Sequence, residues 1–300
     1  MPRSADVAAL IQAAGTRDFY VFKAIAEAMI ARERTRDQED AARTMELAVE
    51  RYLSDSTTPS LRLPSEIGAF VWLEQPRLGL SELFLDPGLL LKIRWFVRER
   101  TQISKLREAG LPLRNRILLA GPPGNGKTSL AGALAKELDL PLIVLKSQTI
   151  VDSYIGRTAR LLEMVFEFVR RNDCLFFMDE LDSLGAKRQG GGGGQQEYNN
   201  ILNSLLVNLD RLPDTTIVVG ATNRLGALDP ALTRRFNLDL HMGNPSATDI
   251  RKYILAYQAK NEMPFGIPLD HVVPRLEGKP WSKVAEYCQD RHRELILGSD

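Results

Sequence analysis

Eight residues near the middle of the chain have the types and spacing needed to bind phosphate. They read Gly121-Pro122-Pro123-Gly124-Asn125-Gly126-Lys127-Thr128, the pattern G-x-x-x-x-G-K-[ST] of a P-loop. Glycine lacks a Cβ, so the backbone can turn tightly and direct successive N–H groups at an anion. Lys127 supplies a positive charge for the β- and γ-phosphates, and the Thr128 hydroxyl is the expected Mg²⁺ ligand. With Ser129, which follows directly, these residues form the predicted nucleotide-binding set.

A pair of carboxylates follows another apolar segment. Cys174-Leu175-Phe176-Phe177-Met178 reads as a buried strand, and Asp179 and Glu180 come directly after it. Ligands of open α/β sheets lie at the C-terminal ends of the strands, so both side chains are expected beside the P-loop. There Asp179 can hold Mg²⁺ through its water shell, and Glu180 can activate or orient the water that attacks the γ-phosphate. A strand end that enters a solvated turn is the alternative.

Two later segments bring polar groups toward the same edge. Asn223 follows the apolar run 216–222 and could hydrogen-bond the attacking water or the γ-phosphate, with a capping role as the alternative. Asp229-Pro230 begins a short helix that ends in Arg234 and Arg235. A surface arginine pair is usually just solvated, but either residue could be an arginine finger inserted into the nucleotide site of a neighbouring subunit.

The elements that must position these groups alternate between strands and helices. Amphipathic periodicity predicts helices between short apolar runs that predict buried strands, at 116–120, 140–145, 174–178 and 216–223. A lead-in helix is expected within residues 80–110, starting at Asp86-Pro87, because proline suits the first helical turn. We therefore predict an α/β fold, a parallel sheet flanked by helices.

In combination, four segments resemble an AAA-type ATPase of the wider AAA+ class, over about residues 80 to 245. They are Gly121–Thr128 (Walker A), Phe176–Glu180 (Walker B), Gly220–Asn223 (sensor 1) and Asp229–Phe236 (second region of homology). The resemblance implies ATP as the nucleotide, Mg²⁺-dependent hydrolysis, and assembly into a homo-oligomeric ring, expected to be a hexamer. Thr233-Arg234-Arg235-Phe236 is shorter than the Arg-Pro-Gly-Arg-Phe of many members and is similar to the branch of severing and endosomal disassembly ATPases.

The resemblance also implies roles for two loops. Tyr154-Ile155-Gly156 lies where the family carries an aromatic pore loop that grips an extended polypeptide in the channel of the ring. The implied partner is a protein client, which hydrolysis would remodel, unfold or disassemble. A tyrosine packed against its own domain is the alternative. The five glycines of residues 190–194 fall at a second, variable pore-facing loop, and their composition predicts mobility.

Flanking segments complete the predicted domain organisation. Residues 1–55 read as a helical N-terminal region, either a partner-binding module or a structural extension, and residues 56–79 as a linker that begins rich in Ser, Thr and Pro. Residues 80–245 are the predicted nucleotide-binding domain, and residues 246–300 resemble the helical lid of the family in a shortened form. Trp281-Ser282-Lys283-Val284 replaces the aromatic-Ser-Gly-Ala sequence with which many members enter the sensor-2 helix.

The composition is that of a soluble globular protein, with 44% hydrophobic and 26% charged residues. A net charge of +1 gives no reason to expect nucleic acid or a membrane surface as a partner. No apolar run approaches the roughly 18 residues that span a bilayer, and the N-terminus lacks the apolar core of a signal peptide. Cys174 and Cys288 are expected to be buried thiols in a reducing cytoplasm.

Two other functions fit part of this pattern. One is an ATP-gated scaffold or switch that activates or assembles a partner enzyme and translocates nothing. The other is a DNA-associated AAA+ loader, against which stand the net charge of +1 and the Tyr154-Ile155-Gly156 loop. The short basic stretch Arg32–Arg36 does not favour DNA, because Glu33 interrupts it and acidic residues follow at once.

Overall fold

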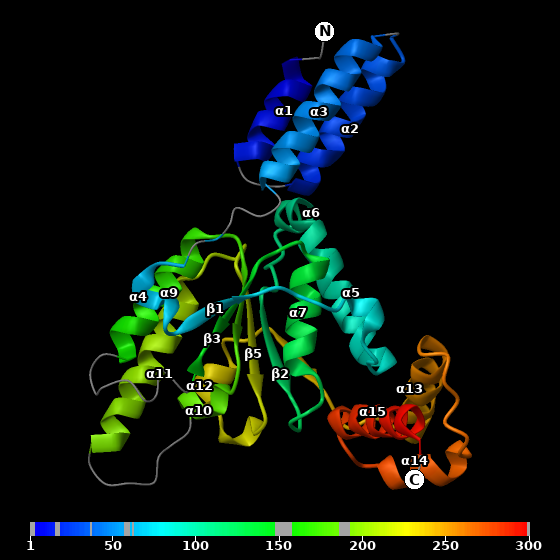
Figure 1. Cartoon of the computed structure of the whole chain (residues 1–300). Helices are drawn as coiled ribbons and strands as arrows, with labels where there is room; N and C mark the ends of the chain where they lie inside the picture. Colours follow the sequence, from blue (N-terminus) through cyan, green and yellow to red (C-terminus); the bar gives the residue numbers. More distant parts are fainter. Residues whose placement is uncertain are drawn as a thin grey trace. The chain divides into compact units, whose positions relative to one another are not determined.

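The computed structural model describes residues 4–15, 19–36, 38–56, 61, 63–147, 158–185 and 193–298. The chain divides into two compact units, residues 1–62 and 63–300 (Figure 1). Each has buried apolar side chains of its own.

The described part of the first unit consists of helices. These are α1 (Ser4–Gly15), α2 (Phe19–Arg34) and α3 (Glu39–Ser56). Phe22, Ala26 and Met29 recur at helical spacing on α2 and are buried, as is Ala42 on α3. Arg34 pairs with Glu46 of α3 at 2.7 Å, so apolar burial and ion pairs both join the helices.

The second unit is built on a sheet of six strands within its described residues. The strands are β1 (Val71–Glu74), β2 (Arg116–Ala120), β3 (Leu142–Leu145), β4 (Leu175–Met178), β5 (Ile217–Thr222) and β6 (Leu238–His241). Their order is β1-β3-β4-β5-β2-β6, and every pairing is parallel except that of β1 with β3. The predicted α/β fold is confirmed.

Helices cover both faces of this sheet (Figure 1). One side carries α5 (Pro87–Thr101), α6 (Ile103–Glu108) and α7 (Lys127–Glu137), and the other carries α9 (Thr158–Arg171) and α11 (Gly193–Arg211). Alternate strand residues serve the two layers: Phe177 packs in the core beneath α5 and α7, whereas Phe176 meets Phe166 of α9 edge-on, with ring centroids 5.3 Å apart. Burial on both faces explains why the central strands are continuous apolar runs.

The lead-in helix begins as its sequence indicates but ends early. The Asp86 carboxylate accepts hydrogen bonds from the N–H groups of Gly88 and Leu89, and Pro87 is the first helical residue of α5. Gln102 then separates α5 from α6, so the segment 80–110 contains two α-helices rather than one, preceded by the short 3-10 helix η1 (Leu80–Glu82).

Part of the predicted linker belongs to the folded unit. Residues 63–79 contain the short helix α4 (Ser65–Gly68) and β1, which extends the sheet by pairing Val71 with Leu145. Ile67 and Val71 are buried there. Most of the Ser, Thr and Pro that suggested a linker lie before this segment, but Pro64 and Ser65 belong to the start of α4. A four-residue strand is too short to show periodicity.

The C-terminal helices form a small core of their own. They are α13 (Ala247–Lys260), α14 (Leu269–Leu276) and α15 (Trp281–Leu297). Ser246 and Asp249 form a capping box at the start of α13. The buried cluster is Ile250, Ile254, Phe265, Val272, Val273, Leu276, Val284 and Cys288, and it is separate from the core beneath α5 and α7. We refer to residues 247–297 as the lid.

Across the described ranges, no helix combines the length and the apolar character needed to cross a membrane. Cys174 and Cys288 are both buried, as expected, and carry free thiols.

Candidate active site

The P-loop connects the C-terminal end of β2 to the N-terminus of α7. Gly124 and Gly126 have φ values of +80° and +82°, in the left-handed region that glycine adopts without strain. The two residues let the backbone fold around the helix N-terminus, where N–H groups are available for an anion. Ser129 lies exposed on the first turn of α7.

Lys127 occupies the centre of this loop. Its ammonium donates to the carbonyl oxygens of Gly121 and Pro122 at 2.8 and 3.0 Å, and to Oδ1 of Asn223 at 2.7 Å. Burial lowers the pKa of Lys127, while the carboxylates of Asp179 and Asp182 oppose that shift. The positive charge is therefore held inside the loop, within reach of any phosphate that binds there.

Thr128 and Asp179 meet beside the loop. The Thr128 hydroxyl donates to Oδ2 of Asp179 at 3.1 Å, and Oδ1 of Asp179 accepts from the N–H of Glu180 at 2.8 Å. A hydroxyl and a carboxylate are hard oxygen ligands, suited to a small divalent cation. No cluster of three His, Cys, Asp or Glu residues that could hold a metal occurs in the described parts of the chain. A cation held by this pair would therefore complete its coordination with phosphate oxygens and water.

Glu180 lies two residues after the end of β4 and has a φ of +52°. A left-handed conformation is costly for a side chain with a Cβ, and such residues cluster at functional sites. The backbone therefore leaves the extended conformation of β4 at Glu180, and α10 (Leu181–Gly185) begins at the next residue.

Asp182 is a site residue that sequence reasoning missed. Its Oδ1 accepts from the Thr222 hydroxyl at 3.0 Å and from the N–H of Asn223 at 3.4 Å. It thereby joins the first turn of α10 to the end of β5 and orients Asn223. Its position two residues after the carboxylate pair, in Asp179-Glu180-Leu181-Asp182, was the available signal.

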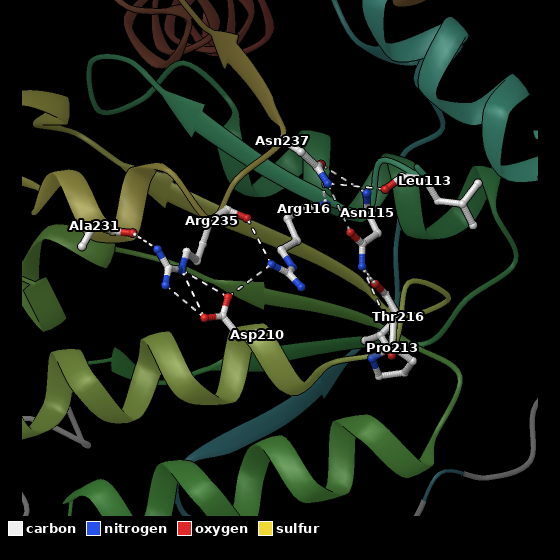
Figure 2. Close-up of polar contacts among 9 residues, drawn as sticks. All are labelled: Leu113, Asn115, Arg116, Asp210, Pro213, Thr216, Ala231, Arg235 and Asn237. Atoms are coloured by element: carbon white, nitrogen blue, oxygen red, sulfur yellow. Dashed lines mark hydrogen bonds and ion pairs between the residues drawn. The ribbon is translucent and has the colours of Figure 1, made fainter. Parts of the chain in front are cut away.

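The two arginines after α12 (Pro230–Thr233) have different surroundings. The Arg235 guanidinium binds Asp210 of α11 through two nitrogens, at 3.1 Å from Nε and 3.0 Å from Nη2 (Figure 2). Arg116, at the start of β2, donates to the Arg235 carbonyl at 3.5 Å and approaches Asp210 to 3.9 Å. Arg235 is thus bound within its own chain. Arg234 is exposed, and its guanidinium has no hydrogen-bond or ion-pair partner among the described residues.

Two asparagine side chains, Asn115 and Asn237, form a hydrogen-bond network close to Arg116 and Arg235 (Figure 2). Asn237 Oδ1 accepts from the backbone N–H groups of Asn115 and Arg116 at 3.2 and 3.1 Å. The Asn115 amide, buried to 3% exposure, donates to the carbonyls of Pro213 and Thr216 at 3.2 and 3.0 Å. The start of β2, the start of β6 and the loop before β5 are therefore held together.

Asn125 is the P-loop residue whose side chain does not face the phosphate cradle. Its amide contacts Met242, Asn244 and Trp281 instead, on the segment leading to the lid and on the lid itself.

The pore-loop residues Tyr154, Ile155 and Gly156, and Gly190 to Gly192 of the second loop, lie outside the described residues.

The model of one family, "ATPase family associated with various cellular activities (AAA)", matches residues 117–244. The match spans β2 to β6 and so contains the P-loop, the carboxylates after β4, Asn223 and both arginines. Residues 117–244 are an AAA ATPase domain. The expected family is therefore confirmed, and with it an ATPase that uses a divalent metal.

Curated relatives of this AAA ATPase differ in how much of it they cover. A Sinorhizobium fredii protein, named uncharacterized AAA family ATPase y4kL, is 29% identical over 92% of this chain and 84% of its own length. The ATP-dependent zinc metalloprotease FtsH of Staphylococcus haemolyticus is 36% identical over 61% of this chain. That of Haemophilus influenzae is 37% identical over 52%. This chain spans about a quarter of these FtsH proteins, 25% and 26% respectively.

Proposed function

We propose that this AAA ATPase binds ATP with Mg²⁺ at its P-loop and hydrolyses it to ADP and phosphate there. The observation that carries the proposal is the meeting of four side chains at the C-terminal edge of the parallel strands. Lys127 reaches Asn223, and Thr128 reaches Asp179, each within hydrogen-bond distance. In this proposal Lys127 binds the β- and γ-phosphates, and the oxygens of Thr128 and Asp179 hold the metal. Mg²⁺, when bound, neutralises charge that develops on the phosphates.

Glu180 and Asn223 act on the attacking water in this proposal. Glu180 accepts its proton or orients it, and Asn223 hydrogen-bonds the water or the γ-phosphate. The left-handed backbone of Glu180 agrees with a functional role, because such conformations cluster at functional sites. Asp182 positions Asn223 by accepting its backbone N–H.

Arg234 of a neighbouring copy completes the site in this proposal. Arg235 is held by Asp210 of its own chain, whereas Arg234 is exposed and available to a second subunit. An arginine supplied in trans stabilises negative charge in the transition state and is worth about 10³ to 10⁵ in turnover. Hydrolysis therefore depends on a ring or another assembly of copies.

Mixing two inactive variants tests this arrangement. Glu180→Gln lacks its water-activating group but supplies Arg234 to a neighbour, whereas Arg234→Ala keeps Glu180. Each variant alone is expected to be inactive, and mixed assemblies recover up to about a quarter of wild-type turnover, because one interface in four then has both groups. Mixing Glu180→Gln with Lys127→Ala, which lacks its phosphate-binding charge but keeps Arg234, provides the control that should stay inactive. If the first mixture also stays inactive while forming mixed assemblies, the trans finger is wrong.

The work done with this energy is proposed to be remodelling of a protein client through a ring pore. Support comes from the likeness to FtsH, which is named as an ATP-dependent protease, and from the aromatic loop at Tyr154. A Tyr154→Ala variant tests threading. Loss of client processing with ATP turnover retained supports it, whereas processing that survives the substitution favours an ATP-gated scaffold.

A further inference from the structure

The side chain of Asn125 forms its hydrogen bonds with groups of the protein outside the P-loop. It is buried to 2% exposure. Its Nδ2 donates to the Met242 carbonyl at 3.3 Å and to Oδ1 of Asn244 at 2.9 Å, and its Oδ1 accepts from the N–H of Trp281 at 3.0 Å. A buried amide bonded on both sides fixes its neighbours in position.

These partners belong to two parts of the fold. Met242 and Asn244 lie on residues 242–246, which connect β6 to α13 and which we call the connecting segment. Trp281 is the first residue of α15. One carboxamide therefore joins the P-loop to the start of the connection and to a helix at the other end of the lid.

Neighbouring bonds reinforce the same junction. The N–H of Ser282 donates to the Gly124 carbonyl at 2.9 Å, and Nδ2 of Asn244 donates to the Gly278 carbonyl at 2.7 Å. A Cβ on Gly124 would approach the Ser282 hydroxyl oxygen to 2.3 Å, so the lid rests directly on the apex of the P-loop. Gly124 and Gly126, on either side of Asn125, both hold left-handed backbone conformations.

Among the described residues, the other contacts between the lid and the α/β part that bear on this junction are apolar. The apolar core of the lid is separate from the core beneath α5 and α7. An aromatic contact comes from Phe84, whose ring lies 4.9 Å from that of Tyr253 and 5.9 Å from that of Trp281. A ligand shifts a conformational equilibrium only through contacts that differ between the two states. The Asn125 contacts start from the loop that phosphate would occupy, so a change of that loop on nucleotide binding would act on the lid through them.

We propose that Asn125 is a positioning residue that sets the orientation of the lid according to the nucleotide state of the P-loop. The inference rests on the proposed binding of ATP at this loop. Adjustment of the loop around phosphate moves the Asn125 carboxamide, and the carboxamide moves the connecting segment and α15 together. Loss of the amide leaves ATP able to bind through the backbone N–H groups and Lys127 but removes the three hydrogen bonds by which Asn125 holds the connecting segment and α15.

The test measures lid position directly. Spin labels are attached to cysteines introduced at Leu111 and Leu255, which are 54% and 52% exposed, on the α/β part and on α13. The buried native thiols, with pKa values raised to about 12, compete poorly for the label. Glu180→Gln is included so that ATP stays bound, and labelled protein is diluted with unlabelled protein so that only distances within one chain are read. Binding of the fluorescent analogue mant-ATP is measured in parallel.

In the labelled background, ATP is expected to shift the distance distribution between the labels. Asn125→Ala should abolish that shift while mant-ATP affinity falls by less than about five-fold, the worth of one ordinary hydrogen bond. Asn208→Ala is the matched control, since Asn208 is also a buried amide, at 4% exposure, but bonds only to Ser204 of its own helix in the described structure. It should retain the shift. If Asn125→Ala does not fold, Asn244→Ala removes the hydrogen bond between Asn125 and Asn244 and that between Asn244 and the Gly278 carbonyl, and should reduce the shift.

Four results would overturn the proposal, and they differ in what else they affect. An undiminished shift in Asn125→Ala, or an equal loss in Asn208→Ala, removes the role of Asn125 and leaves ATP binding intact. If the labelled background protein binds mant-ATP but ATP causes no shift in the distance distribution, nucleotide binding is not coupled to lid position. Absence of mant-ATP binding in the background removes the proposed function together with this inference.

Discussion

The ammonium of Lys127, on the first turn of α7, donates a hydrogen bond of 2.7 Å to Oδ1 of Asn223, directly after β5. These residues are 96 positions apart in the sequence, and parallel pairing of β2 with β5 brings them together. This hydrogen bond thus links the P-loop to the end of β5. It joins Lys127, which we propose binds phosphate, to Asn223, which we propose contacts the attacking water or the γ-phosphate.

Replacing Asn223 should therefore separate binding from hydrolysis. In Asn223→Ala, we expect single-turnover hydrolysis to slow by about 10² to 10³, the usual cost of one transition-state hydrogen-bond donor. The affinity for mant-ATP should stay constant or rise slightly, because Lys127 loses a competing acceptor. Unchanged single-turnover hydrolysis would contradict the role of Asn223.

Asp182 should influence turnover through Asn223 rather than through the nucleotide. Asp182→Ala removes an acceptor of the Thr222 hydroxyl and the Asn223 N–H, and should lower kcat by about ten-fold, the worth of one to two hydrogen bonds. KM should change little. Asp182→Asn keeps a carbonyl oxygen at the same place and should restore most of the turnover, an outcome that a role for the carboxylate charge does not allow.

Substitution of the two adjacent arginines should have different effects, on turnover for Arg234 and on stability for Arg235. Arg234→Ala should reduce turnover by about 10³ or more without lowering the thermal melting temperature, since its guanidinium is exposed. Arg235→Ala breaks the two-nitrogen contact with Asp210 and should lower the melting temperature, and Asp210→Ala should reproduce that loss. Calorimetry and steady-state turnover on the three variants check this, and the reverse pattern would make Arg235 the finger.

How much of this site was predictable depends on the distance between the partners. The strands and the P-loop follow from local patterns, namely apolar runs and the spacing of Gly121, Gly126, Lys127 and Thr128. The pairing of Arg235 with Asp210, and of Asn125 with Trp281, is a property of the folded chain, because 25 and 156 residues separate them. Neighbouring arginines of identical type cannot be told apart before that pairing is known.

Two short, half-buried strands, β1 and β6, also could not be predicted from the sequence. β6 reads Leu-Asp-Leu-His with alternate residues buried, and β1 buries only Val71 of its four residues. Four residues give too few repeats to distinguish a strand from a loop. Both strands are fixed instead by their partners, β2 and β3.

The two cysteines should be unreactive in the folded protein. Burial raises the pKa of each thiol, Cys174 and Cys288, to about 12. At pH 8 the thiolate fraction should then be about 10³ lower than for a thiol with an ordinary pKa. Iodoacetamide should therefore modify both slowly in buffer and rapidly in urea. Rapid modification of the folded protein would contradict their burial.

The same thiols predict a stability loss at high pH. Above the ordinary thiol pKa of 9.0, the unfolded chain loses protons that the folded chain keeps. The unfolded state then binds fewer protons, so the free energy of unfolding decreases as pH rises from about 9 toward 12. Urea melts at pH 8 and pH 10 check the direction, with Cys174→Ala as the comparison that should lessen it.

The central claim is that the site of one chain hydrolyses ATP only when a neighbouring chain completes it. ATP turnover per chain, measured against protein concentration with molecular size followed in parallel, tests it most directly. We expect turnover per chain to rise as assemblies form, and Glu180→Gln to bind ATP without hydrolysing it at any concentration. Turnover per chain that stays flat while the protein remains monomeric with ATP would contradict the claim and exclude an arginine finger from a second copy.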